Sequence, residues 1–165
     1  MKMVNPERSI NVGLGKIAIA QPPDVLTSIG IGSCVVLCLY YDETHTAGMA
    51  HIMLPGGDEN HSNAEMPAKY ADTAVENLLS EFHKKNIRDV RKIKAKIIGG
   101  AQLFRFKQVP NIGEKNIEAV RKALRRRGIR ITGEDVGGNF GRSVWFFADS
   151  GKVVIKSREG ETVLI

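Results

Sequence analysis

The sequence predicts an α+β domain in which two main helices pack on a mixed, largely antiparallel sheet system. Short runs rich in β-branched and aromatic residues recur along the chain, whereas two longer segments carry apolar residues at helical spacing. Proline and glycine fall singly between these segments, as turn residues do, and no repeat or low-complexity linker separates them. With 165 residues, we expect one domain that spans residues 1–165.

The strand predictions follow the chain in order. Residues 27–34 are interpreted as a glycine-rich loop that leads into the strand beginning at Val35. Segments that alternate or are rich in β-branched residues are expected to be strands at 16–20, 35–41, 47–54, 93–98, 129–131, 143–148 and 153–156.

Two helices are predicted from apolar spacing and end signals. The first runs from Pro67 to Lys85, because proline suits the first helical position and apolar residues recur every three or four positions. The second begins after Asn111, which resembles the N-cap of a capping box with Glu114, and stops at Gly128. Its expected buried residues are Ile117, Val120 and Leu124.

Composition limits the functional classes. The apolar runs are far shorter than the ~20 residues of a membrane helix, and the N-terminus has no apolar signal region. We therefore expect a cytoplasmic protein, with no membrane insertion and with both cysteines reduced. The net charge of +6 suggests an acidic partner, but nucleic acid, anionic lipid and an acidic protein surface all satisfy that condition.

Cys34 and His51 form the most informative pair of residues. Glycines before Cys34 allow close backbone approach and can aim amide groups at an oxyanion. If a hairpin turns on Asp42-Glu43, paired residue numbers sum to 85, which places Cys34 opposite His51 with Cβ atoms ~5 Å apart. An imidazole near that distance can draw off the thiol proton. The competing interpretation is a buried cysteine and a strand histidine without catalytic roles.

Two other patterns could indicate a binding site. Cys34 and Cys38, with His45 and His51, loosely fit zinc spacing, but four residues of strand separate the two cysteines by ~13 Å, so Cys38 is expected to be a core residue. The basic run 121–127 lacks interleaved aromatic residues and lies at a helix end, where cations need no ligand. We therefore expect no nucleic-acid partner and no metal.

Several motifs together make the sequence similar to the chemoreceptor glutamine deamidase family CheD. The resemblance covers nearly the whole chain, and the motifs occur in one order. They are residues 30–35, 39–40, 48–55, 98–101, 111–116 and 134–142. The resemblance implies a nucleophile at Cys34 and a base at His51. It also implies a third, hydroxyl-bearing member at Ser28, where the family has threonine, with Thr27 as the neighbouring alternative.

The resemblance further implies deamidation of glutamines on the cytoplasmic helical bundle of methyl-accepting chemotaxis receptors, without a metal or organic cofactor. It implies the phosphatase CheC as a partner, and the alternative function is a non-catalytic regulator of CheC. The implied fold is a strand-rich sandwich similar to the catalytic domain of the cytotoxic necrotizing factor toxins. The segment 137–142 is interpreted as a tight structural turn.

Overall fold

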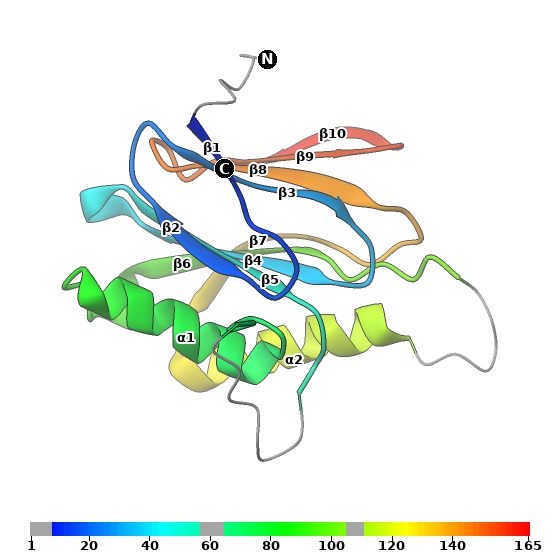
Figure 1. Cartoon of the computed structure of the whole chain (residues 1–165), viewed down its shortest axis with the longest axis horizontal. Helices are drawn as coiled ribbons and strands as arrows, with labels where there is room; N and C mark the ends of the chain where they lie inside the picture. Colours follow the sequence, from blue (N-terminus) through cyan, green and yellow to red (C-terminus); the bar gives the residue numbers. More distant parts are fainter. Residues whose placement is uncertain (1–7, 57–64, 105–110) are drawn as a thin grey trace.

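Three layers make up the fold (Figure 1). In the computed structural model, which describes residues 8–56, 65–104 and 111–165, a central sheet lies between an outer sheet and two helices. The outer sheet has the order β1-β3-β8-β9-β10, with strands Ser9–Asn11, Val25–Ile31, Arg142–Phe147, Val153–Ser157 and Gly160–Leu164. The central sheet has the order β2-β5-β4-β6-β7, with strands Ile17–Ala20, Thr46–Ile52, Val35–Tyr41, Ile93–Gly99 and Arg130–Val136.

Alternation along the central strands creates two cores, one on each face of the central sheet. In β4, Val35, Leu37 and Leu39 pack toward the helices, whereas Val36, Cys38 and Tyr40 pack toward the outer sheet. Both faces of β4 are therefore buried, which explains its nearly continuous apolar sequence.

The sheet topology confirms the α+β prediction. β1 pairs with β3 in parallel and β6 pairs with β7 in parallel, while the other named strand pairs are antiparallel. The expected similarity to the cytotoxic necrotizing factor domain stays a prediction.

Helix α2 (Ile112–Arg127) agrees with the sequence, whereas α1 (Ala71–Lys84) begins later than predicted. The Asn111 side chain accepts the Glu114 amide, and Gly128 ends α2 in a left-handed conformation. Residues 67–70 do not join α1, because the Lys69 carbonyl accepts the backbone amides of Met53 and Leu54, and Tyr70 pairs with Leu54 in an isolated bridge. Neither helix has a stretch long and apolar enough to cross a bilayer.

The predicted loop 27–34 is wrong over most of its length. Residues 25–31 form β3, which pairs with β1 and β8 and has a bulge between Ser28 and Ile31. The glycines obscured this strand, because a bulge tolerates them while the flanking residues keep their ladder bonds. Only residues 32–34 remain as the turn into β4. Strands β1 and β10 were not predicted from the sequence.

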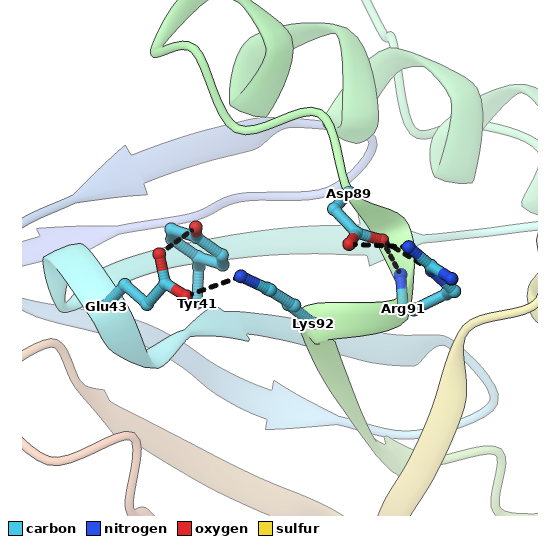
Figure 2. A network of polar contacts seen from close by, with 5 residues as sticks. All are labelled: Tyr41, Glu43, Asp89, Arg91 and Lys92. Carbon is cyan, nitrogen blue, oxygen red and sulfur yellow. Dashed lines mark hydrogen bonds and ion pairs between the residues drawn. The ribbon is translucent and has the colours of Figure 1, made fainter.

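The predicted hairpin register is also wrong. Tyr41 pairs with Thr46, so the connection contains residues 42–45, and His51 lies opposite Val36 rather than Cys34. His45 adopts the left-handed conformation that closes the turn, with φ of 49°. Lysines from the neighbouring chain segment hold the turn through Lys92–Glu43 and Lys94–Asp42 ion pairs at 2.8 and 2.6 Å. Figure 2 shows Glu43 accepting from both Lys92 and the Tyr41 hydroxyl.

Candidate active site

Cys34 is the last residue of the turn 32–34 and directly precedes β4. Its carbonyl accepts the Gly100 amide at 2.8 Å, and the Gly32 carbonyl accepts the Ala101 amide at 2.9 Å. The segment after β6 therefore bonds to the turn at Gly32 and at Cys34. Partial burial raises the pKa of the Cys34 thiol, and a contact with its own backbone amide opposes this shift.

The shifted register still brings Cys34 and His51 to one face of the central sheet. Because Val36 lies opposite His51 and side chains alternate, Cys34 and His51 both point toward the outer sheet. They are diagonal neighbours across the β4–β5 pair, for which Cα atoms are typically ~7–8 Å apart. That separation is within reach of a cysteine and an imidazole that lean toward each other.

His51 is held by its backbone and by its ring. Its backbone amide donates to the Lys16 carbonyl at 3.0 Å, and its carbonyl accepts the Gly15 amide at 2.9 Å. The ring Nδ1 lies 3.1 Å from the Val12 carbonyl oxygen. A carbonyl can only accept, so Nδ1 carries the proton and Nε2 of the neutral ring is left as an acceptor. Burial lowers the pKa of His51, and the bond to Val12 partly opposes this shift.

Ser28 reaches the same carbonyl as the imidazole. Its hydroxyl donates to the Val12 oxygen at 2.7 Å and lies 3.4 Å from the Met49 sulfur. Ser28 therefore supports His51 through Val12 and does not donate to the ring. The Thr27 hydroxyl instead lies 3.5 Å from the Ile10 carbonyl oxygen. Of the two hydroxyl residues, only Ser28 shares an acceptor with His51. Sequence reasoning missed Val12, because a backbone carbonyl leaves no side-chain signal.

The other candidate residues are engaged elsewhere. Cys38 is buried opposite Lys96 in the β4–β6 ladder, and burial raises the pKa of its thiol. Both cysteines are free thiols.

Within the described residues, no group of three or more histidine, cysteine, aspartate or glutamate side chains forms a possible metal site. In the basic run, Arg121 pairs with Glu118 and Glu134 at 2.6 and 2.7 Å.

The segment 137–142 supports the turn 32–34 indirectly. Buried Arg142 donates to the Gly137 carbonyl at 2.8 Å and pairs with Asp135 at 3.2 Å. The Gly137 amide donates to the Gly99 carbonyl, and the Gln102 amide donates to the Gly138 carbonyl, both at 2.9 Å. Residues 137–142 therefore position the segment 99–102, which bonds to the turn that contains Cys34.

Comparison with known proteins finds the same family in a family model and in several relatives. Residues 53–157 match the family model described as CheD chemotactic sensory transduction. The chemoreceptor glutamine deamidase CheD of Thermotoga maritima is 40% identical over 149 residues, covering 90% of this chain and 92% of that protein. The Bacillus licheniformis protein of the same name is 38% identical over 169 residues, covering 99% and 100%. A probable chemoreceptor glutamine deamidase CheD from Archaeoglobus fulgidus is 43% identical over 155 residues, covering 92% and 96%.

Among solved structures, the hypothetical protein YfiH of Bacillus licheniformis aligns with a TM-score of 0.43 at 13% identity. The alignment covers 70% of this chain and 49% of that one.

Proposed function

The chain belongs to the CheD family, and we propose that it is a chemoreceptor glutamine deamidase with Cys34 as nucleophile and His51 as general base. The observation that best supports these roles is the bond between His51 Nδ1 and the Val12 carbonyl. It fixes the tautomer in which Nε2 can accept a proton, on the same face of the sheet as the thiol. The Val12 carbonyl takes the orienting position of a triad, and Ser28 supports Val12.

The proposed reaction is acyl transfer to water. His51 Nε2 takes the Cys34 thiol proton, and the thiolate attacks the carbon of the glutamine side-chain amide. The imidazolium then gives its proton to the leaving ammonia, which leaves a thioester on Cys34. His51 next takes a proton from water, and the resulting hydroxide attacks the thioester carbon and displaces the thiolate. The imidazolium then protonates the thiolate, so that glutamate forms and the thiol and the neutral imidazole are restored. No cofactor is needed for these steps.

The tetrahedral intermediate needs amide donors for its oxyanion. The amide of Gly30 is occupied, because it donates to the Ser143 hydroxyl at 3.1 Å. We therefore assign the donors to the Cys34 amide and a neighbouring amide of the turn 32–34.

The proposed setting is the cytoplasmic helical bundle of chemotaxis receptors, where the net charge of +6 suits an acidic surface. We also propose the phosphatase CheC as a partner, on the family resemblance alone.

The direct test of the proposed activity is mass spectrometry of a cognate receptor cytoplasmic fragment after incubation with the reduced protein. Conversion of specific glutamines to glutamate is expected. No conversion would overturn the proposed activity and favour a binding role toward CheC.

The rate of deamidation should depend on pH through His51. Only the neutral ring accepts the thiol proton, so activity is lost as pH falls and His51 becomes protonated. Because burial lowers the pKa of His51, the midpoint of this acid limb should lie below the ordinary imidazole value of 6.5. A profile of kcat/KM against pH measures it. A midpoint at or above 6.5 would contradict a neutral, desolvated base.

Replacing Ser28 should have a moderate effect. Ser28→Ala removes one of two donors to the Val12 carbonyl, a loss of about 1 kcal/mol that corresponds to roughly fivefold in rate. Ser28→Thr keeps the hydroxyl and should retain most activity. Thr27→Ala is the matched control, because Thr27 contacts a different carbonyl. Equal losses in Ser28→Ala and Thr27→Ala would argue against the supporting role of Ser28.

A further inference from the structure

Asn116 connects the two segments that carry the proposed nucleophile and base. It lies in α2 and is completely buried. Its side-chain Nδ2 donates to the Ser33 carbonyl at 2.9 Å and to the Met53 carbonyl at 3.0 Å. Ser33 directly precedes Cys34, and Met53 follows His51 by two residues. Both hydrogens of one amide group are thus used to join the turn before Cys34 to the end of the His51 strand.

This connection lies where the β4–β5 ladder stops. The paired residues run from Tyr41–Thr46 to Val35–Ile52, and the pairing does not extend to Cys34 and Met53. Beyond this point no β4–β5 ladder bond joins the turn before Cys34 to the end of the His51 strand, although each is bonded to other segments. Asn116 supplies a bridge from a helix, which is a more rigid support than a loop.

The bridge carries a cost in free energy. Asn116 Oδ1 is buried and has no hydrogen-bond partner among the described residues. An unsatisfied buried acceptor typically costs about 1–3 kcal/mol. An apolar residue of similar size would fill the same space without this penalty, so packing alone does not explain an amide at this position.

We propose that Asn116 is a positioning residue, which holds Cys34 at the distance and angle from His51 that proton transfer requires. For the catalytic reaction this inference rests on the proposed function, but reactivity of the Cys34 thiol reports on it independently. Small displacements of reacting groups reduce rates strongly, and a shift of about 1 Å can cost a hundredfold.

The test compares Asn116→Ala with Val120→Ala in the full-length protein. Val120 is also fully buried in α2, one turn further along, and packs in the core between the central sheet and the helices. Both variants should unfold at lower temperature. Alkylation of Cys34 by iodoacetamide is followed across pH, with mass spectrometry to distinguish Cys34 from buried Cys38. Asn116→Leu is a second variant of similar volume, in case the alanine variant folds poorly.

In the wild type and in Val120→Ala, alkylation near neutral pH should be assisted by neutral His51. In Asn116→Ala and Asn116→Leu, the rate of Cys34 alkylation near neutral pH should fall by between about tenfold and a hundredfold. What remains should be mainly the increase in rate at high pH, where the thiol ionises without help from His51. On a receptor fragment, kcat should fall with little change in KM. Folded Asn116 variants with the pH profile of Val120→Ala would overturn the inference. If the wild type deamidates no receptor, the proposed function fails, but the alkylation profiles still decide the role of Asn116.

Discussion

Replacing Cys34 with alanine should reduce deamidation by at least about a thousandfold, to the uncatalysed background. The substitution removes the sulfur that forms the thioester, and no other described thiol can replace it, because Cys38 is buried in the core between the two sheets. Cys34 itself is only partly buried, so the fold should tolerate alanine there. The measurement is a time course of glutamine-to-glutamate conversion on a receptor fragment, at equal concentrations of folded protein.

Cys38→Ala is the matched control. It makes the same substitution four residues later, inside β4, and should lower the free energy of unfolding by about 1 kcal/mol while leaving the rate nearly unchanged. Deamidation by Cys34→Ala at the wild-type rate would exclude Cys34 as the nucleophile. Equal losses of activity in both variants would point to a general effect of damaged packing.

Replacing Gly99 with alanine should destabilise the protein strongly and disturb the candidate site. Gly99 has a φ of +109°, which an L side chain rarely adopts, and an added Cβ would lie 2.4 Å from the Cys34 carbonyl oxygen. Either the end of β6 or Cys34 must move. Strain and overpacking together should cost about 3 kcal/mol, measured by chemical denaturation. Alkylation of Cys34 in the folded variant should also slow.

Gly160 provides the control, because it has nearly the same backbone angle without the contact. Its φ is +111°, and an added Cβ would meet no atom within 4 Å. Gly160→Ala should therefore show the backbone strain alone, about 1 kcal/mol, with normal reactivity of Cys34. If the two variants lose equal stability, the contact with the Cys34 carbonyl has no energetic effect.

The elements predicted best are those whose signals are local. Helix α2 carries its own cap in Asn111, its own stop in Gly128 and a regular apolar face, so its bounds could be read from the sequence. The start of α1 could not, because the bonds that hold Lys69 outside the helix come from residues 53 and 54. Strand β1 is three residues long, and it is stabilised by pairing with β3, which lies beyond β2 in the chain.

The candidate site was predictable in its residues and less so in its geometry. Cys34, His51 and Ser28 are identified by type and motif, and the structure brings all three toward one region. The direct Cys34–His51 pairing failed because Asp42-Glu43 does not form a two-residue turn. The Val12 carbonyl and the Asn116 bridge depend on contacts between distant segments. A single sequence contains no pattern that reports such contacts.

The junction between the two sheets has a consequence for how activity responds to denaturation. Val12 and Ser28 belong to the outer sheet and its flanking segment, whereas Cys34 and His51 belong to the central sheet. The Nδ1-protonated tautomer of His51 is therefore fixed by a bond between the two sheets, and this bond exists only while the sheets are packed together. A partly unfolded species that kept the central sheet and helices but released the outer sheet would keep Cys34 and His51 and lose the bond between His51 Nδ1 and the Val12 carbonyl. The rate of deamidation should therefore fall when the two sheets first separate, before the helical signal in circular dichroism is lost. The rate would then report on the packing between the sheets.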